Sequence, residues 1–434
     1  MEQRVISKLA ARLVPLLCVC FVAAFVDRVN IGFAKLSMSS DLELSEQTYA
    51  TGAGIFFIGY FLCEVPSNLA LQRFGARRWI ARIMLIWGVI SCAMALVEGK
   101  ASFYLLRFLL GVAEAGFFPG VIYYLSSWFP RDFRTRVVAW FMLAAVMSFI
   151  IGSPLSGLLL DHPVFGLEGW QTLFVVESIP SIALAFVVYR SLPDRPEDAA
   201  WLTAEEQAWL RAKLDSEAAS DPAHATTLAA ALRTPSVWLL SAIYFLTVVG
   251  GYGFDFFAPT LLAESLPGLS KTRLGLLLTI PPLVALPVMV WVGRVCDRHG
   301  NQRLAVALGS LGFALGLALL ATGLEGAGAV AAMALCVAAR WSLVGPFWVL
   351  PRSVLGASAA AGGIAFINSL GNLGGQAGPL LLSSLANGSG SHANGLIALA
   401  GLLVLGALLT RWVPAAGATR TAERAISLTD QGEH

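Results

Sequence analysis

The stretch "LVPLLCVCFVAAFVDRVNIGF" (residues 13–33) is long and apolar enough to cross a lipid bilayer as a single helix. Its only charged residues are the neighbours Asp27 and Arg28. Basic residues precede it, as in a signal peptide, but the apolar run continues past signal-peptide length and no small-residue cleavage site follows. We therefore expect a retained first membrane helix that carries an acid and a base within the bilayer, where charge is costly.

The composition of the whole chain agrees with a membrane protein. Of its 434 residues, 57% are hydrophobic and only 13% are charged, whereas a soluble domain carries about 25% charged residues. The net charge of +2 comes without a Lys/Arg block, so nucleic-acid binding is not expected. The six cysteines lack metal-ligand or disulfide spacing, and the five histidines fall in expected loops or the tail. No cofactor, metal site or histidine-based catalytic centre is therefore expected.

Apolar segments of spanning length recur along the chain, and we predict an all-α integral membrane protein with twelve transmembrane helices. The segments are 13–36, 48–70, 79–97, 101–125, 136–160, 171–190, 236–263, 273–295, 303–322, 327–350, 357–386 and 392–412. Two of them, 236–263 and 357–386, are long and rich in glycine, which favours helices that bend or partly unwind.

The distribution of Lys and Arg predicts the orientation. With the N-terminus inside, 22 of the 29 basic residues fall in cytoplasmic segments, 4 fall in outer loops and 3 fall within helices. This bias predicts that both termini are cytoplasmic.

A long polar stretch splits the predicted helices into six plus six. We expect an N-terminal six-helix bundle at 1–190, a cytoplasmic linker at 191–235, a C-terminal bundle at 236–413 and a cytoplasmic tail at 414–434. Within the linker, Thr203 and Glu206 have the spacing of a capping box, which predicts a helix lying at the membrane surface.

The two halves also repeat each other. "QRFGARR" (72–78) follows the second predicted helix and "DRHGNQR" (297–303) follows the eighth, offset by 225 residues. Related bundles joined by a linker are typical of transporters that move by rocking.

The stretch "GRVCDRHG" (293–300) resembles the loop signature of the major facilitator superfamily, with Asp297 and Arg298 as conformational residues; the first-half copy departs from it with Gln72 in place of the acid. The resemblance implies two pseudo-symmetric six-helix bundles. Further motifs resemble the anion:cation symporter family: "DRVNIGFA" (27–34), "GYFLCEVPSNLALQRFGARRW" (59–79), "RFLLGVAEAGFFPGVIYYLSSWFP" (107–130), "GPFWVLP" (345–351) and "GIAFINSLGNLGG" (363–375). That family imports organic carboxylates such as tartrate, aromatic acids and sugar acids, usually with protons, across the bacterial inner membrane.

Charged residues in the first and fourth predicted helices are the main candidates for this function. Arg107 and Glu114 are seven residues apart, so both lie on nearly the same helix face, about 10 Å apart along the axis, and should face the bundle interior. The resemblance assigns Arg28 and Arg107 to the substrate carboxylate, and Asp27 and Glu114 to the coupling protons. A guanidinium stays charged and matches a carboxylate, whereas a buried acid can take up and release a proton.

Several other polar residues are weaker candidates for substrate binding or gating. Tyr60, Asn368 and Asn372 would hydrogen-bond the substrate, although helix packing explains them nearly as well. Tyr252, beside glycines, is a candidate gate residue. Asp255 would tune selectivity, oppose an outer basic residue or be solvated, and Arg340 has no partner that the sequence identifies.

The sequence therefore predicts a monomeric proton-coupled symporter that imports a small organic carboxylate by rocker-switch alternating access. Its expected partners are the anion, protons and the lipid bilayer. The alternatives are an organic-anion exchanger or efflux carrier on the same fold and, more remotely, a membrane-embedded enzyme or a sensor. The identity of the carboxylate and the number of protons stay open.

Overall fold

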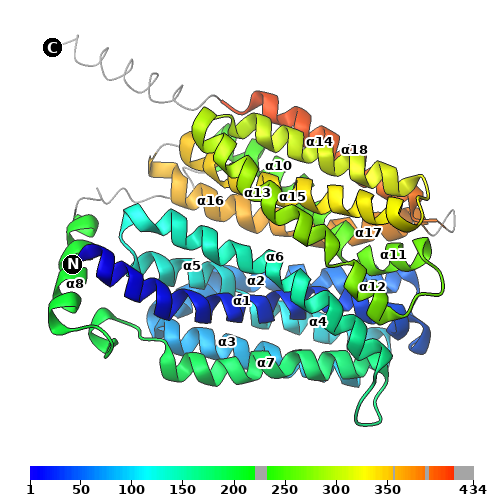
Figure 1. The fold of residues 1–434 in the computed structure, drawn as a ribbon, viewed down its shortest axis with the longest axis horizontal. Coiled ribbons are helices and arrows are strands. Elements are labelled where there is room, and N and C mark those ends of the chain that lie inside the picture. Colours follow the sequence, from blue (N-terminus) through cyan, green and yellow to red (C-terminus); the bar gives the residue numbers. More distant parts are fainter. Residues whose placement is uncertain (220–231, 355–356, 387–390, 415–434) are drawn as a thin grey trace. The chain divides into compact units, whose positions relative to one another are not determined.

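All regular structure in the described part of the chain is helical (Figure 1). The computed structural model describes residues 1–219, 232–354, 357–386 and 391–414. Within these residues, eleven helical stretches are long and apolar enough to cross a membrane. The remaining predicted span is present as two shorter helices, α16 (Ala357–Asn372) and α17 (Gly374–Ala386). The predicted all-helical membrane fold is confirmed.

The described residues form two compact units. The first comprises the described residues of Met1–Ala223, together with Ala258–Thr260 and Gly268–Thr279, and the second comprises those of His224–Phe257, Leu261–Pro267 and Ile280–His434. Helices of the first unit are α1 (Glu2–Asp41), α2 (Glu46–Phe74), α3 (Ala76–Ala93), α4 (Lys100–Glu114), α5 (Phe117–Trp128), α6 (Arg131–Asp161), α7 (Gly169–Ser191), α8 (Ala204–Ala219) and α12 (Lys271–Leu277). Helices of the second unit are α10 (Pro235–Asp255), most of α11 (Ala258–Ser265), α13 (Ile280–His299), α14 (Gln302–Ala321), α15 (Gly326–Val354), α16, α17 and α18 (Ala393–Leu409). The predicted domain limits at 190 and 236 stay a prediction.

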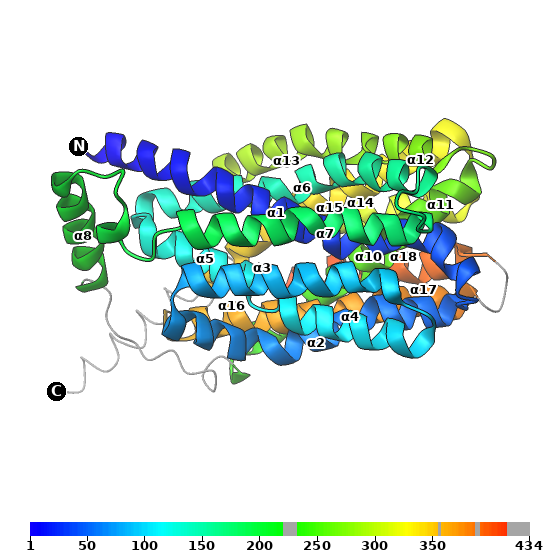
Figure 2. The same ribbon diagram turned by 90° about the horizontal axis from the view of Figure 1, so that it is seen from below.

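Small residues let helices approach closely within each unit. In the first unit, α1 packs on α6 and α7, α3 packs on α7, and α2 packs on α4; Figures 1 and 2 show α1, α3 and α7 running alongside one another. A Cβ added at Gly111 of α4 would lie 1.9 Å from the carbonyl oxygen of Phe56 in α2. In the second unit, a Cβ at Gly378 of α17 would lie 2.1 Å from the carbonyl oxygen of Val249 in α10. Such close backbone contact is typical of membrane helix pairs.

Four predicted spans are interrupted. The glycine-rich segments break as the sequence predicted, at Phe256–Phe257 between α10 and α11 and at Leu373 between α16 and α17. The segment 273–295 also divides, into α12 and α13. The segment 101–125 breaks at Ala115 and Gly116, which the sequence analysis did not predict. Gly116 has φ +87°, and an added Cβ would lie 2.3 Å from Ser67 Oγ, so glycine is required here.

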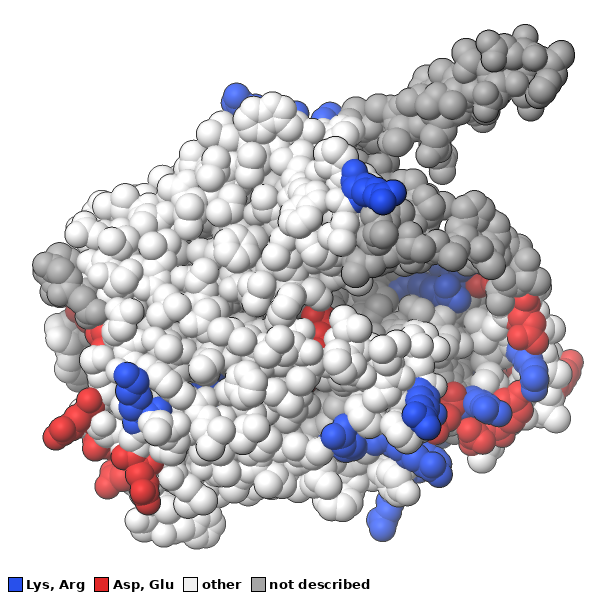
Figure 3. All heavy atoms as spheres, turned by 180° about the vertical axis from the view of Figure 1, so that it is seen from behind, with Lys and Arg blue, Asp and Glu red and all other residues white. Residues whose placement is uncertain are grey.

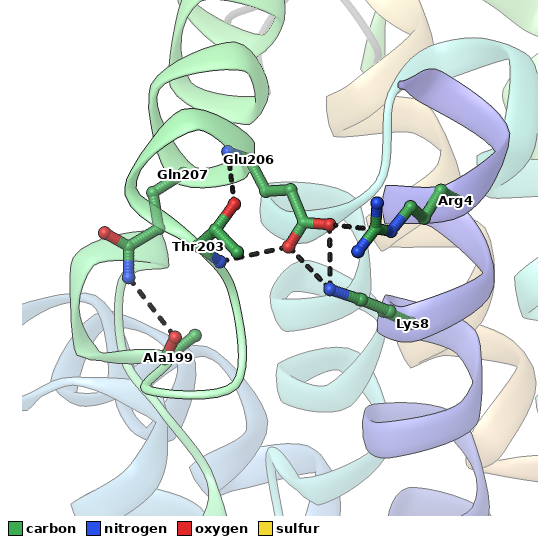
Figure 4. Close-up of polar contacts among 6 residues, drawn as sticks. All are labelled: Arg4, Lys8, Ala199, Thr203, Glu206 and Gln207. Carbon is green, nitrogen blue, oxygen red and sulfur yellow. Dashed lines mark hydrogen bonds and ion pairs between the residues drawn. The ribbon is translucent and has the colours of Figure 1, made fainter.

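The linker helix α8 lies at one end of the first unit, beside the N-terminus (Figure 2). The predicted capping box is confirmed, since Thr203 N–H donates to Glu206 Oε2 (3.0 Å) and Glu206 N–H donates to Thr203 Oγ1 (3.3 Å). Glu206 also pairs with Lys8 (2.7 Å) and Arg4 (3.3 Å) of α1, as Figure 4 shows. The hydrogen bond from Lys8 is the main cause of a pKa of Glu206 below its ordinary value. Further along α8, Glu217 pairs with Arg134 of α6 (3.6 Å).

The predicted internal repeat is visible in the backbone. Gly75, between α2 and α3, has φ +86°, and Gly300, between α13 and α14, has φ +67°. Both turns need a residue with positive φ at the same place in the motif, which explains why glycine occurs in both copies.

Charged side chains are unevenly distributed over the surface. In Figure 3 most of them gather near the ends of the helices, and uncharged surface covers the stretch between. Large apolar side chains such as Leu62, Phe186 and Leu315 are more than half exposed on this protein. An apolar surface of this kind needs a hydrocarbon solvent, as a membrane-spanning protein has.

Candidate functional site

The centre of the candidate site is a buried ion pair between α1 and α4. Arg28 Nη2 donates to Glu114 Oε1, and the side chains are 12% and 2% exposed. The guanidinium carbon lies 5.5 Å from the ring centre of Phe25, 5.3 Å from that of Phe56 and 5.4 Å from that of Tyr60. Aromatic faces attract a cation in a dry site, so Arg28 keeps its charge without complete hydration.

Glu114 occupies an unfavourable place for a carboxylate. It is the last residue of α4, immediately before the break at Ala115 and Gly116. The C-terminal end of a helix carries partial negative charge, which disfavours an anion. The negative form of Glu114 therefore depends on Arg28, and loss of that partner would favour a proton on the carboxylate.

Arg107 is also buried, as predicted, but its contacts are with backbone. Its side chain is inaccessible to solvent, Nη2 donates to the Ala53 carbonyl (2.9 Å) and Nε donates to the Gly52 carbonyl (3.3 Å). The close packing of α2 on α4 brings those carbonyls within reach. In this conformation Arg107 holds α2 against α4, and its predicted contact with a substrate stays a prediction.

Asp27 points away from the Arg28–Glu114 pair. It accepts hydrogen bonds from Trp87 Nε1 (3.0 Å) and Ser91 Oγ (2.9 Å) of α3, and from Ser181 Oγ (2.6 Å) of α7. Adjacent residues of a helix diverge by about 100°, which explains why Asp27 and Arg28 have different neighbours. The structure thus brings Arg28, Tyr60 and Glu114 together and places Asp27 in a separate buried cluster.

The second unit contains a comparable pair that sequence reasoning missed. Arg340 of α15 donates to Asp255 of α10 (2.5 Å), and the side chains are 12% and 4% exposed. The ring centre of the candidate gate residue Tyr252 lies 5.8 Å from the guanidinium carbon. Arg340 is therefore not a lone cation, and Asp255 is neither solvated nor opposed to an outer basic residue.

The two ion pairs occupy corresponding positions of the internal repeat with their charges exchanged. Asp255 lies 227 residues after Arg28, and Arg340 lies 226 residues after Glu114, close to the 225-residue offset of the repeated loops. Asp255, like Glu114, is the last residue of its helix before a break. The repeat offset was the signal in the sequence that could have identified this pair.

The remaining predicted residues lie elsewhere in the second unit. Asn368 and Asn372 are partly buried near the C-terminal end of α16, before the break at Leu373. Asp297 and Arg298 are exposed in the last turn of α13.

Asp194 is a further residue that sequence reasoning missed. It follows α7 in the stretch "LPDRPED", and its Oδ1 accepts a hydrogen bond from Arg77 N–H (2.8 Å) in the first turn of α3. Gln72 occupies the acid position of the first-half loop signature, and Asp194 supplies a carboxylate to that loop from another part of the chain.

Apolar spanning helices that enclose ion pairs are typical of a membrane carrier for a small molecule. The sequence matches the Major Facilitator Superfamily over residues 16–379, so the chain belongs to this family.

Relatives with similar sequences agree with this family. The chain is 44% identical over 435 residues to a protein from Agrobacterium vitis whose name includes the words tartrate transporter, covering 98% of this chain and 95% of that protein. It is 40% identical to a "Quinolone resistance transporter" from Acinetobacter baumannii (94% of each chain). It is 38% identical to "Inner membrane transport protein RhmT" from Escherichia coli K12 (99% and 98%).

The solved structures show the same fold. The inward open conformation of the xylose transporter XylE from E. coli matches with a TM-score of 0.74 at 16% identity, covering 93% of this chain and 96% of that chain. The predicted family, including its anion:cation or acid-permease type, is confirmed. The chain is a multi-pass membrane transporter and not an enzyme, and its bacterial relatives imply the plasma membrane.

Proposed function

We propose that the chain is a proton-coupled symporter that imports a small organic carboxylate by rocker-switch alternating access. The observation that carries this proposal is the buried Arg28–Glu114 pair, surrounded by Phe25, Phe56 and Tyr60. The guanidinium can bind either the carboxylate of Glu114 or the carboxylate of a substrate, so the two compete.

Protonation of Glu114 resolves this competition. A proton on the Glu114 carboxylate removes its charge, and Arg28 is released to bind the substrate anion. When the proton leaves to the more alkaline cytoplasm, the Glu114 anion recovers Arg28 and the substrate dissociates. Transport then requires that the loaded, protonated form favours a different conformation from the empty form.

Other side chains complete the proposed site. Tyr60, already beside Arg28, would donate a hydrogen bond to the substrate, and Asn368 and Asn372 would contribute from the α16 break. Arg107 would contact substrate in a conformation in which it leaves the α2 carbonyls. Asp27 would carry a second coupling proton, for which its burial at 2% exposure is the support.

The conformational residues and the orientation also belong to the proposal. Tyr252, beside the ion pair of the second unit, would act in gating, and Asp297 with Arg298 would stabilise one conformation at the end of α13. We further propose a monomer with cytoplasmic termini, which the 22 cytoplasmic basic residues against 4 outer ones support.

Uptake into proteoliposomes tests the proposal. With labelled tartrate outside, an alkaline interior and the membrane potential set to zero, one coupled proton gives up to about tenfold accumulation per pH unit. Equal uptake with and without the pH gradient would contradict proton coupling. Uptake of other mono- and dicarboxylates in the same vesicles defines the substrate class.

The relative named for quinolone resistance favours a second candidate, proton-driven efflux on the same fold. Cells of a drug-sensitive host expressing this chain distinguish the two candidates. Import predicts unchanged quinolone sensitivity and faster growth on the transported acid, whereas efflux predicts lower drug accumulation.

A further inference from the structure

Glu177 of α7 is a buried acid that the proposed cycle does not yet use. Its side chain is 2% exposed, and Oε1 accepts a hydrogen bond from Ser156 Oγ of α6 (2.6 Å). The neutral side chain of Asn30 on α1 donates a hydrogen bond to the same carboxyl group. The Asn30 side-chain oxygen is buried and has no hydrogen-bond partner in the described part of the chain. Buried polar groups in native proteins are nearly always paired, so this cluster lacks one donor.

Glu177 and Asp27 belong to one polar cluster. On α1, Asp27 and Asn30 are three residues apart, and on α7, Ser181 and Glu177 are four apart, so each pair lies on a single helix face. Ser181 Oγ donates to Asp27 (2.6 Å), and Asn30 faces Glu177 one turn along. Because Ser181, which donates to Asp27, lies one turn of α7 from Glu177, the two carboxyl groups occupy neighbouring turns of the same helix interface.

The hydrogen bonds of this cluster come only from neutral groups. Asp27 accepts from Trp87, Ser91 and Ser181, and Glu177 accepts from Ser156. In the described part of the chain, neither acid forms an ion pair with Lys or Arg, and the further charge that acts on Asp27 is the acid Glu114.

Several charged groups on α1, α3 and α6, the helices that pack against α7, contact residues other than Asp27 and Glu177. On α1, Arg28 pairs with Glu114 and Lys35 with Glu46. The arginines of α3 lie in its first two turns, where Arg77 contacts Asp194 and Arg82 lies over the Trp79 ring. On α6, Arg134 pairs with Glu217, Arg136 lies over the Trp140 ring, and Asp161 accepts hydrogen bonds from Thr272.

Two adjacent buried carboxylates without a cation cannot both stay ionised. A buried charge needs a partner, and a carboxylate that lacks one takes up a proton instead. A proton on Glu177 would also give Oε2 a donor that could reach the unsatisfied Asn30 oxygen.

We propose that Asp27 and Glu177 form a linked carboxyl pair that shares one exchangeable proton, so that Glu177, together with Asp27, carries the second proton of the transport cycle. A carboxylate of the pair binds a proton from water, and the acid so formed later returns that proton to water on the other side. Asp27 of the pair lies on α1, next to Arg28, and Glu177 lies on α7, so the charge of the pair acts on the helix that would bind the substrate. This role rests on the proposed function, whereas the presence of an exchangeable proton on the pair does not.

Infrared spectroscopy of the purified protein tests the exchangeable proton directly and needs no substrate. The carbonyl band of protonated carboxylic acids is followed between about pH 5 and pH 9, in H2O and D2O, the range in which a coupled buried acid would titrate. We expect a titrating band in the wild type. Glu177→Gln should remove the component that belongs to the pair and leave the component from Glu114, and Glu177→Asp should restore the lost component. Glu98→Gln, which removes an exposed acid, is the matched control and should keep the band. A wild-type spectrum without a titrating band, or one that Glu177→Gln leaves unchanged, would overturn the proposal.

Transport assays then test whether this proton is coupled. With labelled tartrate as the probe, Glu177→Gln should keep tartrate exchange within about twofold. Accumulation driven by a two-unit pH gradient should fall by up to about a hundredfold, because one coupled proton yields about tenfold per pH unit. Accumulation equal to that of the wild type would refute the coupling role. If the wild type itself shows no pH-driven uptake, the proposed symport fails, and the infrared titration still decides whether the pair holds a proton.

Discussion

The substitution Glu114→Gln tests the competition for Arg28 most directly. Glutamine keeps the shape and a hydrogen-bond acceptor but removes the negative charge that holds the guanidinium. If Glu114 takes up a proton at acid pH, as proposed, substrate binding to the wild type should weaken as pH rises. In Glu114→Gln the competitor is neutral at every pH, and binding should become nearly independent of pH.

The size of the effect follows from the burial of the pair. Two unit charges in contact interact by about 4 kcal/mol at the effective dielectric of about 20 that suits protein sites. Because the glutamine oxygen still accepts a hydrogen bond from a charged donor, worth about 1.5–3 kcal/mol, the net competition removed is about 1–2.5 kcal/mol. At alkaline pH the variant should therefore bind an anion about 5- to 70-fold more tightly than the wild type.

Equilibrium binding of tartrate to the purified protein measures this difference at an acid and an alkaline pH. Glu98→Gln serves as the control, since it removes a negative charge that is exposed. The reasoning is refuted if Glu114→Gln retains the pH dependence of the wild type or binds more weakly at alkaline pH. A normal melting temperature of the variant excludes a folding defect as the cause.

Other outcomes follow from packing and charge. Arg340→Met should destabilise the second unit by about 3–5 kcal/mol because it leaves Asp255 as a buried unpaired acid. The double variant Arg340→Met, Asp255→Asn should recover most of that stability. Chemical denaturation measures both changes. Gly111→Ala should prevent folding because the new Cβ would lie 1.9 Å from a carbonyl oxygen. Gly99→Ala, whose Cβ would have no atom within 4 Å, should fold normally. The height of the folded peak in size-exclusion chromatography measures the difference. Glu206→Gln should speed amide hydrogen exchange in α8 at neutral pH. The pKa of Glu206 lies below 4.5, so its ion pairs stabilise α8 above that pH and are lost as the pH falls further. At such low pH the amide exchange rates of α8 in the variant and the wild type should become equal.

Hydrophobic runs in the sequence identified the helices, but not where every helix breaks. Apolar length alone predicts a span, and glycine clusters predicted the breaks after Asp255 and at Leu373. The break after Glu114 lies in "AEAGFFPG" (113–120), whose Gly116 and Pro119 are helix-breaking residues within an otherwise apolar span. The position of the break also depends on Gly116, with its positive φ, fitting against Ser67 of α2, a tertiary contact that the local sequence does not show.

The candidate residues were predicted more completely than their partners. The cost of charge within a membrane correctly marked Arg107 and Glu114 as buried and Arg28 as mostly withdrawn from solvent, with its side chain 12% exposed. The same argument applied to Glu177, a lone acid in the sixth predicted span, and would have found it. Pairing was harder to predict, because Arg28 and Glu114 are 86 residues apart in the chain, and which of two arginines meets the acid depends on how the helices are rotated.

The placement of both helix-terminal acids gives a physical reason for coupling an anion to a proton. Glu114 and Asp255 each end a helix, where the helix dipole opposes a negative charge, and each contacts an arginine. If a substrate carboxylate takes that arginine, the acid would remain as a buried, unpaired anion unless a proton arrives with the substrate. Binding of the substrate without a proton is then unfavourable in free energy, because it leaves a buried carboxylate without a partner. An exposed pair would lack this property, since water would stabilise the released carboxylate and the substrate could bind without a proton.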